Sequence, residues 1–195
     1  NIDPLIGFPK NITIDFGNGC TSLNGIARSG KINVTLSDSL NKTGAIAVMT
    51  FENYIVNGFK NEGTLTWTTT TQNNIKSWTR KSENGKVTEP GGRYWLHAGM
   101  QTVTQTDGLA TPFNFADDGF SITGSHTVTS QEGISGTAEI TEALEKKVIC
   151  ANIDKGKVKL QGPNHFAIID YGDGTCDNKA TVSIDGNTPR NILLW

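Results

Sequence analysis

The feature that most constrains this chain is a repeated alternation of apolar and polar residues, in short stretches separated by glycine-containing turns. In 31–37 (KINVTLS), Ile32, Val34 and Leu36 fall on one face of an extended strand, and polar residues fall on the other. Such stretches recur about every 10 to 14 residues, whereas only 137–148 has a composition that would also suit a helix. The pattern predicts an all-β protein in which many short antiparallel strands are joined by hairpins into a sandwich or a curled meander.

Three dipeptides predict tight turns between strands. Asn-Gly at 57–58 and 84–85, and Asp-Gly at 118–119, combine residues that adopt positive φ, which two-residue hairpins require. The strands expected from the alternation are residues 31–37, 45–51, 64–71, 75–81, 120–128, 157–160, 165–170, 180–184 and 191–194. No linker rich in proline or serine interrupts them. Residues 1–195 are therefore predicted to form a single all-β domain, with two similar halves as the alternative.

Charge and hydropathy argue against two classes of partner. Seventeen basic and nineteen acidic residues give a net charge of −2, and no block carries one sign. The sequence therefore offers no electrostatic basis for binding nucleic acid or an anionic membrane surface. No apolar run approaches the roughly 20 residues of a transmembrane helix, so no membrane-spanning segment is predicted. The chain begins at Asn1 without a signal pattern, which we interpret as a processed or trimmed product.

A turn-like motif occurs twice, as IDFGNGC at 14–20 and as IDYGDGTC at 169–176. One interpretation of the second copy is a calcium loop, because Asp170, Asp173 and Asp177 lie close together in the sequence. The spacing departs from a calcium-binding EF-hand loop. Counted from Asp173, an asparagine stands where the turn glycine belongs, and an isoleucine stands at the twelfth position in place of glutamate.

A structural interpretation of the motif explains more of its residues. Asp15 and Asp170 each end a strand, where a carboxylate accepts hydrogen bonds from backbone N–H groups of the following turn. The following aromatic residue of each copy would anchor the turn by packing. The glycines of the motif supply backbone angles that a side chain would forbid, and they are Gly17, Gly19, Gly172 and Gly174. We therefore predict two structural turns, and no metal, cofactor or catalytic residue.

The three cysteines allow either a nucleophile or a disulfide. A thiolate nucleophile needs a nearby histidine or another positive group, and the histidines (97, 126 and 165) lie in no recognisable context of that kind. Their wide separation also argues against a three-histidine zinc site. Cys150 and Cys176 flank two expected neighbouring strands, so they form the best candidate pair. Cys20 is then left free or competes for the bridge.

The tryptophans leave a choice between sugar binding and core packing. Trp67, Trp78, Trp95 and Trp195 would stack on sugar rings if they were exposed, and would be core residues if they were buried. Three glycosylation sequons also occur, at residues 11, 33 and 41, in a chain that is rich in asparagine throughout.

Three blocks of the chain resemble one family. NITIDFGNGCTSLNGIARSGKINVTL (11–36), FENYIVNGFKNEGTLTWT (51–68) and IDYGDGTCDNKATVSIDG (169–186) are similar to a group of secreted proteins and lipoproteins of Bacteroidetes bacteria. The resemblance implies an all-β protein that is exported beyond the inner membrane. It also implies a tether through a lipidated N-terminal cysteine in a segment ahead of Asn1. The family brings no established activity and no catalytic residues.

We therefore expect a non-enzymatic, exported cell-surface module with a structural or adhesive role, located in the outer membrane, at the cell surface or in the periplasm. Its partner would be a surface molecule or a glycan. A carbohydrate-binding protein that uses exposed aromatic residues is the first alternative. A hydrolase whose site is assembled from residues distant in the sequence is the second.

Overall fold

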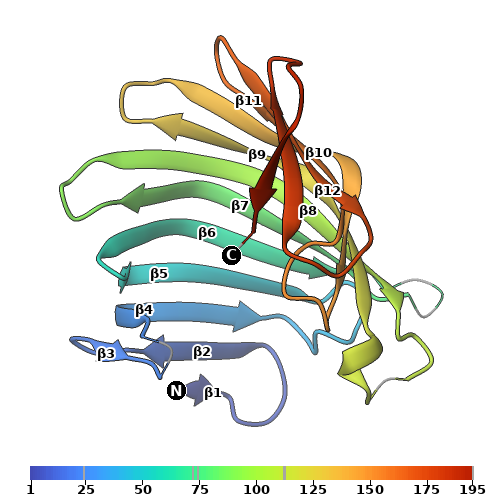
Figure 1. Cartoon of the computed structure of the whole chain (residues 1–195). Coiled ribbons are helices and arrows are strands. Elements are labelled where there is room, and N and C mark those ends of the chain that lie inside the picture. The colour runs from blue at the N-terminus through green and yellow to red at the C-terminus, as the bar shows by residue number, and fades with distance from the viewer. Residues whose placement is uncertain (24, 72, 74, 112, 195) are drawn as a thin grey trace. The chain divides into compact units, whose positions relative to one another are not determined.

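The computed structural model describes residues 1–23, 25–71, 73, 75–111 and 113–194, and strands dominate it (Figure 1). Strand residues make up 63% of the described residues, and they form a 14-stranded antiparallel sheet that is not closed. The order of strands in the sheet follows the order in the sequence, except that β3 pairs with β4 beside the main path. The prediction of an antiparallel all-β protein is therefore confirmed.

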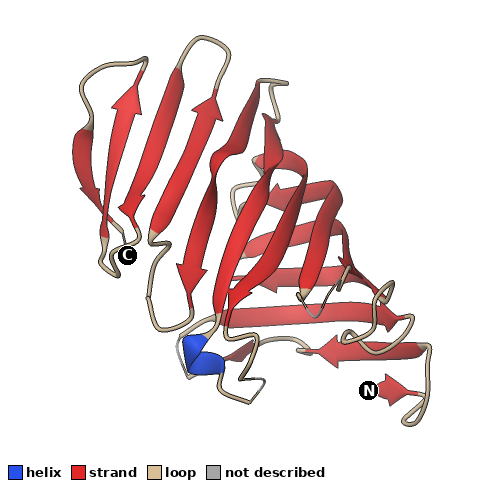
Figure 2. Cartoon of the chain, turned by 90° about the vertical axis from the view of Figure 1, so that its right-hand side faces the viewer, coloured by secondary structure: helices blue, strands red, loops and turns tan. Residues whose placement is uncertain are grey.

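The strands are β1 (Ile2–Asp3), β2 (Lys10–Asp15), β3 (Cys20–Thr21), β4 (Ala27–Leu36), β5 (Ile46–Val56), β6 (Phe59–Thr69), β7 (Ser77–Thr88), β8 (Tyr94–Asp107), β9 (Gly119–Ser130), β10 (Ser135–Lys147), β11 (Lys155–Gln161), β12 (Phe166–Asp173), β13 (Lys179–Ile184) and β14 (Arg190–Leu193). Within the described residues, the one helical element is a 3-10 turn, η1 (Phe115–Asp117), drawn blue in Figure 2. The helix-compatible stretch 137–148 lies almost entirely in β10.

The three predicted turns have different outcomes. The tight turn expected at 118–119 was wrong, because β8 already ends at Asp107 and Asp118 has extended backbone angles (φ −67°, ψ 134°) just before β9 begins. The turn at 57–58 joins β5 to β6, and both of its residues have positive φ (47° and 86°). The expected hairpin at 84–85 was wrong, because β7 runs without a break through both residues. Gly63 of β6 approaches the backbone of Asn84 so closely that a Cβ would collide with it, and Asn84 keeps a positive φ of 52° inside the strand. The sequence signal thus marks a distortion of a long strand, not its end.

The chain divides into two compact units, which we describe separately. Unit 1 comprises residues 1–70, 79–99 and 128–134. Unit 2 comprises residues 71–78, 100–127 and 135–195. Three of the five boundaries (78/79, 99/100 and 127/128) fall inside strands β7, β8 and β9, and the other two (70/71 and 134/135) fall between strands.

Unit 1 contains a sheet with two different faces. Residues paired directly across antiparallel strands share a face, and the register pairs Ile32 with Phe51 and Met49 with Leu65. The apolar face follows from this register and carries Ile12, Ile14, Ile32, Val34, Leu36, Ala47, Met49, Phe51, Leu65 and Trp67. The opposite face is polar apart from Ile46 and Val48, and carries Asn11, Thr13, Asp15, Lys31, Asn33, Thr35, Thr50, Glu52, Thr64, Thr66 and Thr68. We call the latter set the polar face of unit 1.

Unit 2 repeats the same segregation over β10 to β14. Its apolar face carries Ala138, Ile140, Val158, Leu160, Ala167, Ile169, Ala180, Val182, Ile184 and Ile192. Among the described residues, the buried apolar side chains are Ala45, Ala47, Tyr54, Leu144, Cys150 and Ala180. Large apolar side chains that are more than a third exposed outnumber them. Most of the apolar face in each unit is therefore half-buried, as expected for a sheet without a covering layer of helices.

Each unit contains a β-bulge at a glycine that is followed by a lysine. Gly30 (φ 78°) precedes Lys31 on β4 and lies against the backbone carbonyl of Asn53 on β5. Gly156 (φ 104°) precedes Lys157 on β11 and lies against the backbone carbonyl of Ala143 on β10. In both places the register slips by one residue, so one strand carries an extra residue. Glycine is required there because any Cβ would overlap the neighbouring strand.

Candidate functional site

The repeated turn has the same hydrogen bonding in both copies. The Asp15 Oδ1 atom accepts a hydrogen bond from the Gly17 N–H at 2.8 Å, and the Asp170 Oδ1 atom accepts one from the Gly172 N–H at 3.0 Å. The four motif glycines all have positive φ, at 58°, 143°, 94° and 105° in chain order. These contacts have the geometry that the structural interpretation predicts.

The aromatic residue packs on a neighbouring ring in the first turn and is half-buried in the second. In unit 1, the ring centroids of Phe16 and Tyr54 lie 5.7 Å apart, and Tyr54 stacks on Phe51 at 5.5 Å. Tyr54 is buried, so the turn after β2 is fixed to the interior of unit 1. In unit 2, Tyr171 is half-buried, and burial raises the pKa of its phenol because the charged form is disfavoured away from water.

A lysine next to each bulge glycine links the turn to a third strand. Lys31 pairs in register with Asp15, and its Nζ atom lies 3.4 Å from the Glu52 carboxylate. Lys157 lies 2.7 Å from Glu142 and 3.7 Å from Asp170. The hydrogen bond that Lys157 donates to Glu142 raises the pKa of Lys157 above its usual value. The same Glu–Lys–Asp arrangement therefore spans β5–β4–β2 in unit 1 and β10–β11–β12 in unit 2.

The three calcium candidates each have a turn role in the structure. Asp170 accepts the hydrogen bond from the Gly172 N–H described above. The Asp173 Oδ1 atom accepts hydrogen bonds from the Thr175 N–H and hydroxyl, at 3.2 and 2.8 Å. Both bonds lower the pKa of Asp173. The bond from the Thr175 hydroxyl has the larger effect, and the bond from the Thr175 N–H has the next largest. The Asp177 Oδ1 atom accepts one from the Lys179 N–H at 2.9 Å. The described part of the chain contains no group of three or more His, Cys, Asp or Glu residues placed to hold a metal ion.

An open cavity of about 210 Å³ lies beside these turns. Its lining includes Asp170, Tyr171, Asp173, Asp177, Lys179 and Asn191. Carboxylate, amide and ammonium groups thus surround an accessible depression at the start of β13.

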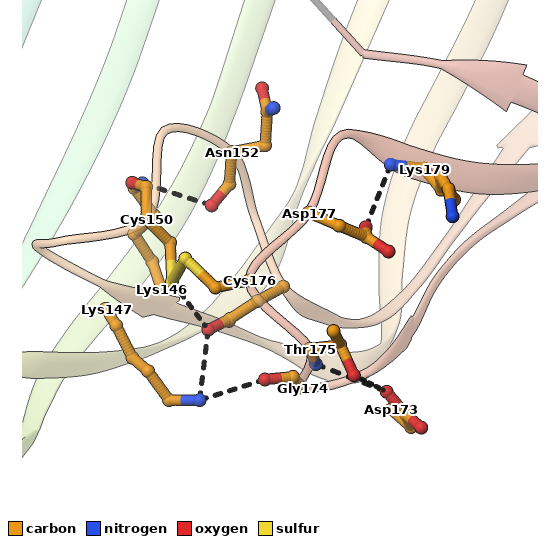
Figure 3. The surroundings of a disulfide bond; sticks show 11 residues. Lys146, Lys147, Cys150, Asn152, Asp173, Gly174, Thr175, Cys176, Asp177 and Lys179 are labelled. Atoms are coloured by element: carbon orange, nitrogen blue, oxygen red, sulfur yellow. Dashed lines mark hydrogen bonds and ion pairs between the residues drawn. A yellow bond between two sulfur atoms is a disulfide. The ribbon is translucent and has the colours of Figure 1, made fainter.

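The disulfide of this end of unit 2 joins Cys150 to Cys176, the pair that the sequence favours (Figure 3). Their Cα atoms are 5.3 Å apart, inside the roughly 7 Å that a bridge allows. The bond ties the loop after β10 to the loop after β12. Cys150 is buried, whereas Cys176 is exposed. Cys20 is free and exposed, and it pairs in register with Arg28.

Two lysines at the end of β10 hold the bridged loops in place. Lys146 donates through Nζ to the backbone carbonyls of Cys150 and Asn152, the latter at 3.0 Å. Lys147 donates to the carbonyl of Gly174 at 2.9 Å, as Figure 3 shows. The disulfide is therefore embedded in a network that connects both loops to the sheet.

Asp154 is the buried charge of this network. Its side chain is 1% exposed, and its Oδ2 atom lies 3.4 Å from Lys147 Nζ and 3.6 Å from Cys150 Sγ. The Oδ1 atom is buried without a hydrogen-bond partner in the described part of the protein. A buried carboxylate with an unpaired oxygen is costly, and such groups in native proteins call for an explanation.

The histidines lie in separate environments. The His165 Nδ1 atom is 2.6 Å from the Asp185 carboxylate. The pKa of Asp185 is lowered mainly by the hydrogen bond from the Phe166 N–H, and next by the hydrogen bond with His165. The His97 Nδ1 atom is 3.3 Å from the Ser82 hydroxyl. His126 lies half-buried on β9. A histidine metal centre is thus not assembled within the residues described.

The described tryptophans are half-buried. Trp78 meets Phe120 edge-on with ring centroids 5.6 Å apart, and Trp95 packs at 6.2 Å from Phe59. Trp67 lies on the apolar face of unit 1. Trp195 lies outside the described residues. Trp95 also lines a small cavity of about 110 Å³ together with Glu89, Arg93, Tyr94, Ser130 and Glu132.

Sequence reasoning missed two parts of this site. The bulge repeat was visible as SGKINV at 29–34 and KGKVKL at 155–160, a signal that comparison of the two halves could have found. The Lys147–Asp154 pair had no such signal, because a lysine and an aspartate seven residues apart are unremarkable until the loop folds back.

Comparison with protein-family models, with curated proteins and with solved structures found no match. No helix in the described ranges is long and apolar enough to cross a membrane.

Proposed function

We propose that this chain is a non-enzymatic, exported cell-surface module with a structural or adhesive role. The observation that carries the proposal is the polar face of unit 1, an ordered array of hydroxyl and amide groups opposite an apolar face. The hydroxyl and amide groups of this face can supply direct hydrogen bonds to a partner, of which a typical interface contains about ten.

The two sequons in strands are part of this array. Asn11 pairs with Thr35 across β2 and β4, and Asn33 pairs with Thr13. The Thr13 hydroxyl donates to Asn33 Oδ1 at 3.0 Å, and the Thr35 hydroxyl donates to Asn11 Oδ1 at 3.1 Å. These bonds fix the side chains before a partner arrives, which lowers the entropic cost of association. These two bonds use the amide oxygens of Asn11 and Asn33 and not their N–H groups. The N–H groups can therefore donate to a neutral, polar partner.

Export is supported by the disulfide of unit 2. Disulfides persist in oxidising compartments such as the bacterial periplasm and cell surface, and are rare in the cytosol. The family resemblance at 11–36 and 169–186 points to the same location.

A pair of matched variants tests the adhesive role. Thr50 is exposed near the centre of the polar face, whereas Thr127 is an exposed strand residue in unit 2. We expect the labelled wild-type protein to bind at least one member of a panel of neutral polysaccharides and of immobilised collagen. Thr50→Arg should weaken that binding at least tenfold, and Thr127→Arg should not. Absence of binding across the panel, or equal effects of the two variants, would contradict an adhesive role.

The cavity beside Trp95 favours carbohydrate binding as a second candidate function. Two aromatic rings, two carboxylates and a guanidinium line this cavity, and Arg93 Nε lies 3.8 Å from Glu89. Sugars are held by such combinations of stacking and planar polar groups. Under this alternative, Glu132→Gln would abolish polysaccharide binding and Thr50→Arg would spare it. The two variants therefore separate the candidates.

A further inference from the structure

The two sulfurs of the disulfide differ sharply in accessibility. Cys150 is 3% exposed, whereas Cys176 lies on an exposed loop. A thiolate attacks a disulfide along the line of the S–S bond, so it needs access to the sulfur that it attacks. An incoming thiol therefore reaches Cys176, and Cys150 is the leaving group.

Asp154 faces the leaving sulfur. Its Oδ2 atom is 3.6 Å from Cys150 Sγ, and a disulfide sulfur has no hydrogen to donate to it. The charged groups around the pair are Lys147, at 3.4 Å from the same oxygen, Lys146, which is bound to loop carbonyls, and Lys155, which pairs with Glu145. The buried carboxylate thus has one oxygen shared between an ammonium group and a sulfur, and one oxygen without a partner.

We propose that Cys150–Cys176 is a thiol–disulfide exchange site for small thiols, in which Cys176 is attacked and Asp154 keeps the released Cys150 as a thiol. A carboxylate beside a sulfur disfavours a thiolate there and favours a thiol that donates a hydrogen bond. Reduction would therefore give the Asp154 carboxylate a donor that the oxidised form lacks.

The exchange balances with two thiols as the reductant. The first thiolate, RS⁻, bonds to Cys176 Sγ, the S–S bond breaks, and Cys150 leaves with the electron pair and takes a proton from solvent. A second thiolate attacks the R sulfur of the mixed disulfide, releases RSSR, and leaves Cys176 to take a proton. The two cysteines are reduced and the two small thiols are oxidised.

The surroundings allow the bond to open without loss of the fold. The Gly174 N–H donates to the Asp154 carbonyl at 2.8 Å, and Lys147 donates to the Gly174 carbonyl, so the two loops stay connected. Reduction then changes the chemistry of one exposed residue, Cys176, which becomes a thiol open to exchange with disulfides and to alkylation.

Glutathione provides the first test, with the complete, folded, oxidised chain. We expect limiting glutathione, quenched early in acid and mapped by mass spectrometry, to appear on Cys176 at least tenfold more often than on Cys150. After full reduction under native conditions, iodoacetamide should alkylate Cys176 at least tenfold faster than Cys150. A mixed disulfide on Cys150, or equal alkylation of both cysteines, would overturn the proposal.

A variant pair tests the role of Asp154. Asp154→Asn removes the charge beside Cys150, so it should raise both the rate of reduction by glutathione and the rate of Cys150 alkylation severalfold. Glu139→Gln removes an exposed charge from β10, eight residues away from Lys147 along the strand, and should change neither rate. Unchanged rates in Asp154→Asn would refute the assignment. If that variant fails to fold, the wild-type mapping and alkylation still decide the proposal.

Discussion

The bulge glycine of unit 2 gives the sharpest prediction, because a second glycine acts as its matched control. Gly156 and Gly172 both have φ near +100°, at 104° and 94°. A Cβ on Gly172 would meet no heavy atom within 4 Å, whereas a Cβ on Gly156 would collide with the backbone of Ala143 and Leu144. Alanine at either position therefore has the same unfavourable φ. Only the alanine at 156 also overlaps a neighbouring strand.

The expected free energies follow from these two terms. A non-glycine residue at such a φ costs about 1–3 kcal/mol, so Gly172→Ala should destabilise the protein by that amount. Overlap inside a packed structure costs about 1–3 kcal/mol more, because the backbone of β10 must shift. Gly156→Ala should therefore be less stable than Gly172→Ala by about 1–3 kcal/mol. Gly30→Ala in unit 1 should resemble Gly156→Ala, since its Cβ would overlap Asn53 and Glu52.

Urea unfolding followed by tryptophan fluorescence provides the measurement. With a slope of about 2 kcal/mol per molar urea, the difference between the unit 2 variants corresponds to a midpoint shift of about 0.5–1.5 M. Trp78 belongs to the same unit as both glycines, so it reports on their local unfolding. Equal urea midpoints for Gly156→Ala and Gly172→Ala would contradict the close contact of β11 with β10 at Gly156.

Three further predictions concern the carboxylates of unit 2. Asp170→Ala should lower the free energy of unfolding by about 0.5–1.5 kcal/mol, because the Gly172 N–H loses its acceptor. Asp170→Asn keeps an acceptor oxygen and should lose much less stability in the same urea assay. Equal losses in the two variants would contradict the turn assignment. Millimolar calcium should leave the melting temperature within about 1 °C, and a rise of several degrees in a thermal scan would reveal a metal site. The pKa of Asp173 is lowered in the folded state, so its contribution to stability is present above the unfolded pKa of about 3.9 and is lost as the pH falls through the folded pKa. Asp173→Asn should therefore flatten the decline of the urea midpoint below about pH 4, and an unchanged slope would count against the Thr175 hydrogen bonds.

The candidate site was partly visible in the sequence, and the reason is its local character. An Asx turn is made within three residues, so Asp15 with Gly17 and Asp170 with Gly172 could be identified from the motif. The disulfide was inferable because few strands separate Cys150 from Cys176. The environment of Asp154 was not inferable, since its burial and its contact with the disulfide depend on how a loop folds back on β10.

By itself, the sequence determined the class of structure. Period-two alternation assigns each strand residue to one face before any pairing is known, and Ile32, Val34 and Leu36 do lie on one face. Positive φ is likewise a property of a single residue, so the turn at 57–58 was predictable. The tertiary structure decided what Asn84-Gly85 does, because a glycine on β6 and the ring of His97 approach that backbone from neighbouring strands. A local signal records only that a residue tolerates positive φ. Whether the chain reverses there or bulges within a continuous strand depends on which strands lie alongside, and that is fixed by contacts distant in the sequence.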